Sequence, residues 1–310
     1  MSAGMAFATP GVLRRWGTPR GALAADEPWG RLEEVGSGLW ALISTPQTGD
    51  FTTISNGGIV AGRRGVLIYE GTGSNEGARW MAEQARMLAG RGPTHVVISH
   101  HHGDHTAGVG GFAPPEDAPS LRVTAATRDR VAAGIDAAAE PDRARLWADA
   151  DLIDVDRPTE IDLGDRTVVV RPYLGHTASD VTLDLPEDDV TWCGDLVWNG
   201  WFPNYTDARP TRLSETVRAI QGDGRKTYVP GHGPLSGASE MATYVSVIDH
   251  VEAAGRAAFA AGMSAEDAAA AYALPDAVSD WVIFNPQFFE RAMRAWIREL
   301  GEGRDLDAAP

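Results

Sequence analysis

Four metal-binding side chains follow directly after one short apolar run, and this feature constrains the fold more than any other in the chain. Residues 94–99 (THVVIS) are typical of a buried strand, and the run ends at His100, His102, Asp104 and His105. Alternate residues at the end of a strand point the same way. His100 and His102 can therefore bind one metal ion while the other two, across the turn, bind a neighbouring ion. Imidazole suits zinc, and a carboxylate adds negative charge, so the motif predicts a metal centre at a strand end.

Three later segments have the same form, in which an apolar strand is followed by a glycine and then by a metal-type side chain. Their metal-type residues are His176, Asp195 and His232. Each Gly-His or Gly-Asp pair alone is a common turn, and a polar loop or an expression tag is the alternative reading of the first motif. A tag, however, would be a uniform run at a terminus. Because all four segments occur in order along one chain, we predict seven metal ligands.

Composition excludes several classes of function. Hydrophobic residues make up 43% of the chain and charged residues 23%, as in ordinary globular proteins. The formal net charge of −16 repels phosphate backbones and anionic lipid, so we expect a small-molecule substrate and neither nucleic acid nor a membrane as partner. The single cysteine, Cys193, excludes an internal disulfide and favours the cytoplasm, with the periplasm or secretion as the alternative. The oligomeric state is left open, a homodimer included.

The order of the predicted elements favours one domain with two sheets packed face to face and helices outside. We predict this domain over residues 31–310, with a helical C-terminal tail over about 237–302, after a loosely ordered arm over residues 1–30. Whether the arm contains a processed export signal is left open, because its charged and apolar parts occur in the reverse of the usual order. Predicted strands cover residues 39–44, 53–61, 65–70, 94–99, 121–125, 160–174, 181–185, 190–194 and 226–229. Predicted helices cover residues 75–88 (with Asn75 as N-cap), 127–138, 141–148, 212–220, 238–261, 264–273 (with Ser264 as N-cap) and 286–300.

The four motifs together resemble the metallo-β-lactamase superfamily, and the resemblance extends over about residues 36–234. It implies an α/β (α+β) fold, namely a four-layer αββα sandwich with two metal ions at one edge, between the sheets. By position in the motifs, the resemblance assigns His100, His102 and His176 to the first ion, Asp104, His105 and His232 to the second, and Asp195 to both.

The activity that this resemblance implies is that of a dinuclear zinc-dependent hydrolase. A metal-bridging hydroxide would attack a carbonyl substrate, which is an ester, a lactone, a thioester or a β-lactam. Asp104 is the predicted catalytic residue, because it can hydrogen-bond the nucleophile and pass its proton to the leaving group. Two zinc ions per chain are the expected cofactors, and the same ligands accept manganese, iron or cobalt. Cys193 lies in an apolar strand and is expected to fill core volume instead of acting as a nucleophile.

Asp195 makes the chain more similar to the glyoxalase II and lactonase branches than to the true β-lactamases, which generally have Cys or Ser near that place. Acyl-homoserine lactonases usually carry a Tyr three residues after the bridging Asp, where this chain has Trp198. Tyr205 could replace that Tyr only if the loop folds back. Trp198, Trp201, Phe202 and Tyr205 either line an apolar substrate pocket or pack the loop against the core, and the sequence leaves both readings open.

Other polar residues are candidates for supporting roles. Glu70 lies where the family usually has an Asp that supports the metal loop, so it either supports that loop with a longer reach or is purely structural. His101 is expected to be exposed or to support a ligand, and His95 and His250 are expected to be structural.

Two alternative functions stand beside the carbonyl hydrolase. A phosphodiester hydrolase of the same fold would need a basic substrate-binding face, which the charge of −16 opposes. A non-catalytic metal-binding scaffold would be expected to have lost ligands, and none of the seven is missing. The sequence does not identify the physiological substrate.

Overall fold

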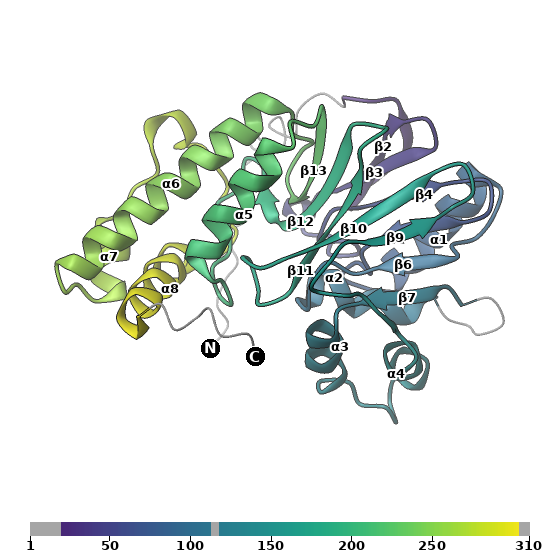
Figure 1. Cartoon of the computed structure of the whole chain (residues 1–310), viewed down its shortest axis with the longest axis horizontal. Helices are drawn as coiled ribbons and strands as arrows, with labels where there is room; N and C mark the ends of the chain where they lie inside the picture. Colours follow the sequence, from purple (N-terminus) through teal and green to yellow (C-terminus); the bar gives the residue numbers. More distant parts are fainter. Residues whose placement is uncertain (1–19, 113–117, 304–310) are drawn as a thin grey trace.

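The computed structural model describes residues 20–112 and 118–303. Two β-sheets pack face to face, and helices cover their outer faces (Figure 1). This arrangement confirms the predicted αββα sandwich. In the described part of the chain, no helix combines the length and the apolar character that spanning a membrane requires.

The first sheet has eight strands in sequence order. The first to the fifth strands pair antiparallel with their neighbours. The fifth strand also pairs parallel with the sixth, and the parallel pairing continues to the eighth. The carboxyl ends of the parallel strands therefore meet at one edge of the sheet, where polar side chains collect. The strands are β1 (Leu23–Glu27), β2 (Gly30–Gly36), β3 (Leu39–Ser44), β4 (Gly57–Ala61), β5 (Val66–Tyr69), β6 (His95–Val97), β7 (Ser120–Val123) and β8 (Asp151–Leu152).

The second sheet has five strands in the order β13-β12-β11-β10-β9. Only the β12–β13 pair is parallel among these described strands, so both of these strands also end at the same edge. The strands are β9 (Thr159–Asp162), β10 (Thr167–Tyr173), β11 (Asp180–Leu185), β12 (Val190–Trp198) and β13 (Thr227–His232).

The helices divide between the two outer faces. Helix α1 buries Ala78, Trp80 and Met81 against the first sheet in one apolar cluster. Helices α5, α6 and α8 share a second cluster with the facing sides of both sheets, so the C-terminal helices extend the core of the sandwich. The helices are α1 (Asn75–Ala89), α2 (Gly103–Thr106), α3 (Ala125–Ala132), α4 (Pro141–Ala148), α5 (Pro210–Gly222), α6 (Ala238–Ala260), α7 (Ala265–Ala271) and α8 (Phe288–Glu302), with short 3₁₀ turns at Pro46–Thr48, Ala107–Phe112 and Asp276–Val278.

The structure corrects some of the predicted element bounds. The prediction of a loose arm over residues 1–30 is wrong for its last part, because Leu23–Glu27 forms strand β1 and pairs with β2. Residues 1–19 of the predicted arm lie outside the described residues. The N-cap of α1 is Ser74 and not Asn75, since the Ser74 hydroxyl accepts a hydrogen bond from the Gly77 amide. Ser264 does cap α7, as predicted.

Candidate metal centre

The predicted ligands converge on the edge where parallel strands of both sheets end. His100 and His102 follow β6, and His102 directly precedes the short helix α2, which contains Asp104 and His105. His176 lies between β10 and β11, Asp195 within β12, and His232 at the end of β13. Hydrogen bonds join the two sheets here: the Tyr69 hydroxyl donates to the Val181 carbonyl, and the Asn56 amide donates to the Pro230 and Gly233 carbonyls.

The first group of donors consists of His100, His102, His176 and Asp195. His102 Nδ1 lies 3.0 Å from His100 Nε2 and 2.9 Å from His176 Nε2. His176 Nε2 lies 3.3 Å from Asp195 Oδ2. Three imidazoles and one carboxylate oxygen thus face one point, which is a ligand set typical of zinc.

The second group consists of Asp104, His105, His232 and again Asp195. His232 Nε2 lies 3.1 Å from Asp104 Oδ2 and 3.3 Å from Asp195 Oδ1. His105 Nε2 lies 3.2 Å from the same Asp195 oxygen. The first two groups are therefore neighbours that share a single carboxylate. A third group among the described residues, His101, His102 and Asp207, shares His102 with the first.

Asp195 gives one oxygen to each group: Oδ2 faces the first and Oδ1 the second. Its position depends on glycine. A Cβ atom on Gly231 would lie 2.0 Å from Asp195 Oδ1, so any larger residue there would displace the carboxylate. Gly194 adopts a φ of +52°, a conformation that L side chains rarely adopt. The glycines of the Gly-Asp and Gly-His pairs thus make room for the shared carboxylate.

The charges and the unsatisfied hydrogen-bonding atoms of the centre fit bound cations. Among the described side chains, the buried Asp195 Oδ1 and His105 Nε2 atoms lie 3.2 Å apart, but neither makes a hydrogen bond. Burial lowers the pKa of His100 and lowers that of His176 to about 3, so both imidazoles are neutral and keep a lone pair for a metal ion. Burial alone would also lower the pKa of His232, but Asp195 and Asp104 outweigh it and raise that pKa to about 9. The second group therefore holds protons that a cation would displace.

Glu70 supports the second group. Its Oε1 lies 3.1 Å from His105 Nδ1, and its Oε2 accepts a hydrogen bond from the Ser99 amide. Glu70 is fully buried directly after β5. Because a carboxylate on the far nitrogen orients an imidazole, the loop-supporting reading of Glu70 agrees with the geometry.

Asp207 supports the first group, and sequence reasoning missed it. Asp207 Oδ2 lies 3.0 Å from His102 Nε2 and 3.3 Å from His101 Nε2. The hydrogen bonds from these two imidazoles hold the pKa of Asp207 well below its usual range. Asp207 lies in the loop between β12 and α5 with no motif around it, so no spacing pattern could have identified it.

The aromatic run that starts at the last residue of β12 is buried. Trp198, Trp201, Phe202 and Tyr205 are 0–3% exposed and belong to the main core cluster. The Trp198 ring lies 4.3 Å from the His232 ring, centroid to centroid. These contacts favour the packing reading, in which the run supports a metal-binding histidine, over the reading as a substrate pocket.

The remaining candidates have structural surroundings. Cys193 is fully buried and burial raises its pKa, so the thiol stays protonated in the core, as expected. His95 is half-buried in β6, and His250 is exposed with Nε2 3.1 Å from the Ala273 carbonyl. His101 points to Asp207 instead of either donor group.

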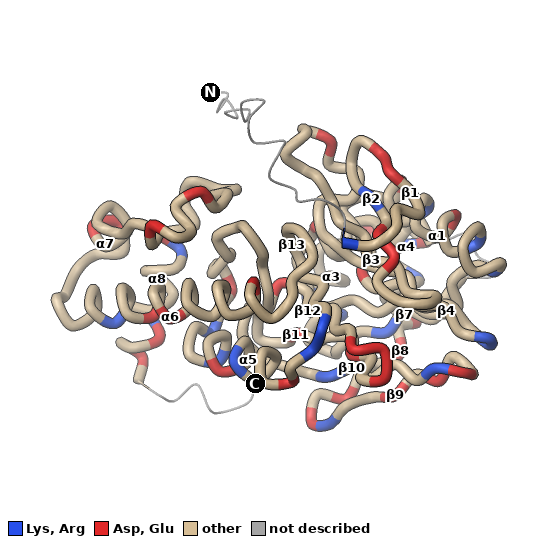
Figure 2. The backbone as a smooth tube through the Cα atoms, turned by 90° about the horizontal axis from the view of Figure 1, so that it is seen from above, with Lys and Arg blue, Asp and Glu red and all other residues tan. Residues whose placement is uncertain are grey.

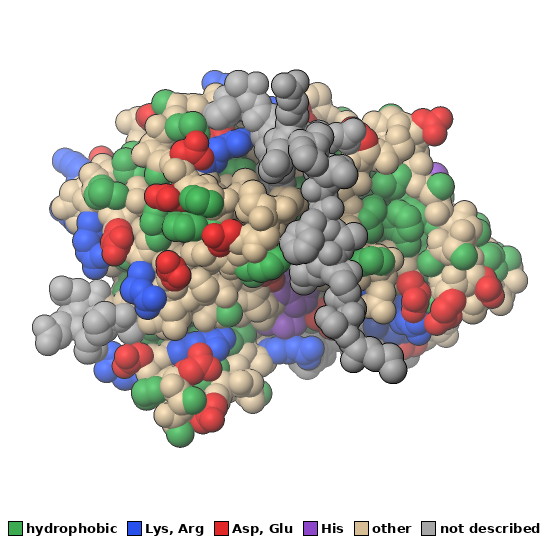
Figure 3. Space-filling view, turned by 180° about the vertical axis from the view of Figure 1, so that it is seen from behind, with side chains coloured by type: hydrophobic (Ala, Val, Ile, Leu, Met, Phe, Trp, Pro, Cys, Tyr) green, Lys and Arg blue, Asp and Glu red, His purple; other side chains and the backbone are tan. Residues whose placement is uncertain are grey.

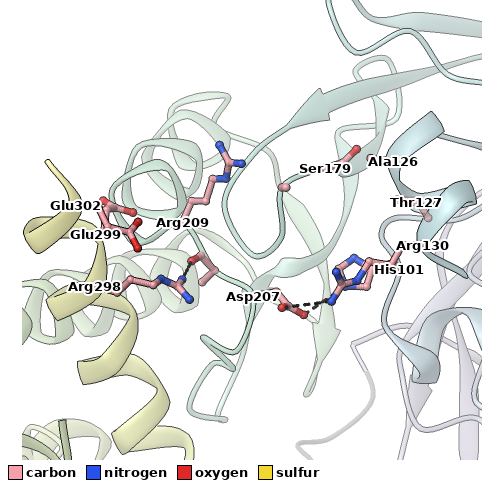
Figure 4. Close-up of a pocket in the computed structure, with 12 residues that line it drawn as sticks. His101, Ala126, Thr127, Arg130, Ser179, Asp207, Arg209, Arg298, Glu299 and Glu302 are labelled. Atoms are coloured by element: carbon pink, nitrogen blue, oxygen red, sulfur yellow. Dashed lines mark hydrogen bonds and ion pairs between the residues drawn. The ribbon is translucent and has the colours of Figure 1, made fainter. Parts of the chain in front are cut away.

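A cavity of about 410 Å³ lies beside the centre. His101 and Asp207 line one side of it, and Arg130, Arg209 and Arg298 reach it from three separate segments (Figure 4). Figure 3, the view from behind Figure 1, shows histidine side chains that reach the surface of the molecule. The cavity adjoins the centre through Asp207, which contacts His102, although none of the seven ligands is among its lining residues.

An αββα sandwich with two His/Asp donor groups at its edge defines a metal-dependent hydrolase. The family description "Metallo-beta-lactamase superfamily" matches residues 51–232, more than half of the chain. The chain belongs to this superfamily. No curated protein matches the sequence significantly.

Several solved structures are similar in fold. An inverting sec-alkylsulfatase, Pisa1 from Pseudomonas sp., has a TM-score of 0.69 at 17% identity over 90% of this chain. The chain spans about half of that protein, 52% of its length. A metallo-β-lactamase from Pontibacter korlensis has a TM-score of 0.55 at 19% identity, covering 71% of this chain and 99% of its own. The mono-zinc form of the metallo-β-lactamase FIM-1 from Pseudomonas aeruginosa has a TM-score of 0.56 at 18% identity, with 71% and 95% covered.

Proposed function

We propose that this hydrolase uses two zinc ions to cleave a carbonyl substrate, namely an ester, a lactone or a thioester, and acts more weakly on β-lactams. The observation that carries the proposal is the division of the two Asp195 oxygens between the two donor groups. A carboxylate in that position holds two cations at a short separation. It also supports placing the chain with the glyoxalase II and lactonase branches.

Bound zinc would lower the pKa of a shared water molecule and polarise the substrate carbonyl oxygen. The side chains of the protein would orient the nucleophile and move its proton. Asp104 is the most exposed of the seven ligands, with a side chain 25% exposed. Burial alone would raise its pKa, but His105 and His232 outweigh burial and lower it to about 2. Asp104 is therefore ionised at neutral pH, and we assign it the role of accepting a proton from the nucleophile and passing it to the leaving group.

Charge supports a neutral or weakly charged substrate. Lys and Arg positions are spread over helices and strands, with Asp and Glu positions between them (Figure 2). A phosphodiester backbone would require a continuous basic face, and the net charge of −16 opposes one. The alkylsulfatase and the β-lactamases of similar fold justify including sulfate esters and β-lactams among the substrates to be tested.

The test is metal analysis of the purified protein together with a hydrolysis panel. The panel contains lactones, thioesters, p-nitrophenyl esters, β-lactams, phosphodiesters and alkyl sulfates, each assayed before and after chelation and after zinc is restored. We expect zinc-restorable hydrolysis to be fastest on a carbonyl ester, lactone or thioester. A phosphodiester or an alkyl sulfate as the best substrate would refute the carbonyl assignment, and activity unaffected by chelation would refute the metal assignment.

A further inference from the structure

Two cavities beside the metal centre share part of their lining. The smaller one, of about 410 Å³, is next to Asp207, and a larger one of about 970 Å³ lies beyond it. Ala126, Ala178, Ser179 and Arg209 line both, and Figure 4 shows Ser179 and Arg209 on opposite sides of the smaller one. The two cavities are therefore neighbouring parts of one hollow, which we call the extended groove.

The near end of the extended groove lies against the metal centre. Its lining includes Asp207 and His101, and Asp207 Oδ2 lies 3.0 Å from His102 Nε2. The groove therefore begins one side chain away from the first donor group, at the Asp207–His102 contact.

The far end of the extended groove contains a cluster of exposed hydrophobic side chains. Leu152, Val155 and Leu174 line it with exposed fractions of 51%, 57% and 38%. They are three of the eight large hydrophobic side chains that are exposed in the described part of the chain. Isolated exposed hydrophobic residues are ordinary, but a cluster that lines a cavity is typical of a binding site.

The size and the charge of the far end define what fits it. Cavities of roughly 300–1,000 Å³ accommodate small molecules, so the volume suits a substrate arm better than a protein partner. Charged side chains of both signs also line this part, so it favours neither an anionic nor a cationic end group. They are Asp129, Asp154, Asp156, Glu215, Arg209 and Arg212. An uncharged apolar chain needs no charged partner and can lie against Leu152, Val155 and Leu174.

We propose that the extended groove binds an uncharged acyl or alkyl arm of the substrate. The arm leads from the scissile bond past Asp207 and Arg209 to Leu152, Val155 and Leu174. This inference rests on the proposed carbonyl hydrolysis and specifies its substrate class, namely esters or thioesters of medium-chain, uncharged acyl groups. It also moves the apolar subsite away from the Trp198–Tyr205 run, which the core buries.

The first experiment compares p-nitrophenyl acetate with p-nitrophenyl octanoate on the zinc-loaded protein. Each buried methylene contributes about 0.8 kcal/mol, so partial burial of the longer chain should raise kcat/KM for octanoate roughly tenfold or more over acetate. Val155→Ser combined with Leu174→Ser should lower the octanoate-to-acetate ratio roughly tenfold through KM. Phe259→Ser and Met87→Ser replace exposed hydrophobic residues on α6 and α1, outside the groove, and should leave the ratio unchanged.

A second variant tests the volume of the groove without making it polar. Val155→Trp fills the far end and should exclude octanoate, whereas Met87→Trp adds the same bulk elsewhere. A wild-type protein that does not prefer octanoate, or a preference that survives both the double Ser variant and Val155→Trp, overturns the inference.

Binding of octanamide, measured by calorimetry, separates this inference from the proposed function. If no p-nitrophenyl ester is hydrolysed, the carbonyl proposal fails. Octanamide binding that is lost in Val155→Trp but kept in Met87→Trp then still supports the groove. If acetate is hydrolysed but octanamide binds equally to both Trp variants, only the groove assignment fails.

Discussion

Asp207 Oδ2 lies 3.0 Å from Nε2 of His102, whose other ring nitrogen faces the first donor group. A carboxylate at Nε2 fixes the proton on that nitrogen and leaves Nδ1 with a lone pair for a metal ion. Arg130 lies near the other oxygen of Asp207, at 3.8 Å. A residue in a loop without a motif therefore determines how one of the predicted ligands is oriented.

Asp207→Ala should weaken the metal affinity of the first group by about 10- to 100-fold, as supporting carboxylates of metal-binding histidines generally do. Glu302→Gln is the matched control, because Glu302 lines the same cavity without contacting a ligand in the part of the chain described. Zinc titration against a competing chelator measures the effect. Equal affinity in Asp207→Ala and wild type would mean that Asp207 is only a surface partner of the two histidines.

Asp195→Ala should abolish binding of the metal pair, whereas Cys193→Ala should leave it intact. Asp195 contributes an oxygen to both groups, while the Cys193 thiol is buried in the core and should cost only about 1–2 kcal/mol of unfolding free energy when removed. Metal content by elemental analysis and denaturant unfolding measure the two effects. Comparable metal loss in a folded Cys193→Ala protein would show that the end of β12 has been misassigned.

The zinc-loaded chain should carry two metal ions in native mass spectrometry, and chelation should lower its melting temperature. The reason is that removal of the ions leaves buried imidazoles and carboxylates facing one another without a shared cation, and ligands that bind only the folded state stabilise it. Restored zinc should restore both the mass and the melting temperature. A protein that keeps its activity and melting temperature with no metal in the spectrum would contradict this prediction.

Trp198→Ala should weaken metal binding at the second group, because the indole ring lies 4.3 Å from the His232 ring. Trp147→Ala is the control, since Trp147 is equally buried but packs in the cluster under the first sheet. Both changes should cost about 3–5 kcal/mol of unfolding free energy, and only Trp198→Ala should also reduce zinc affinity in the competition titration. If Trp198→Ala instead raises KM for bulky substrates with full metal content, the substrate-pocket reading of the aromatic run is correct.

Asp180 should make the metal-free protein less stable as pH rises. Burial raises the pKa of Asp180 from 3.8 to about 7, despite hydrogen bonds from Thr177. The folded state therefore binds a proton more tightly than the unfolded state, so this contribution is complete below pH 3.8 and is lost as pH rises through about 7. Denaturant unfolding across this range should show a smaller fall in Asp180→Asn than in wild type; an identical slope would rule out the shift.

The fold and the set of ligands could be predicted because both are recorded in local sequence. Apolar strands that end in Gly and a metal-type residue give the strand, its end and the ligand together, as at Gly194 and Asp195. Strand β3 and helix α4 have the predicted bounds, because their apolar patterns and flanking residues allow only one residue as the start of each element. At the start of α1, Ser74 and Asn75 are both good N-caps, and only the hydrogen bond from Gly77 decides between them.

The supporting residues and the groove could not be predicted in the same way. Asp207 reaches His102 from a loop 105 residues further along the chain, so only the tertiary fold brings the two side chains together. The walls of the extended groove come from the segments around β7–β8, β10–β11 and α5. The aromatic run was ambiguous for a related reason: the same rings could line a cavity or fill the core, and burial by α8 decided the outcome.

The donor groups draw their side chains from both sheets, with the His100–His105 segment following β6 of the first and His176, Asp195 and His232 belonging to the second. Neither sheet alone can supply four ligands around one cation. During refolding in the presence of cobalt, the visible absorption of tetrahedrally bound cobalt should therefore be absent while each sheet forms separately. It should appear only when the two sheets pack together. In this protein the rate at which the absorption of the substituted metal appears would report the rate of the last assembly step of folding.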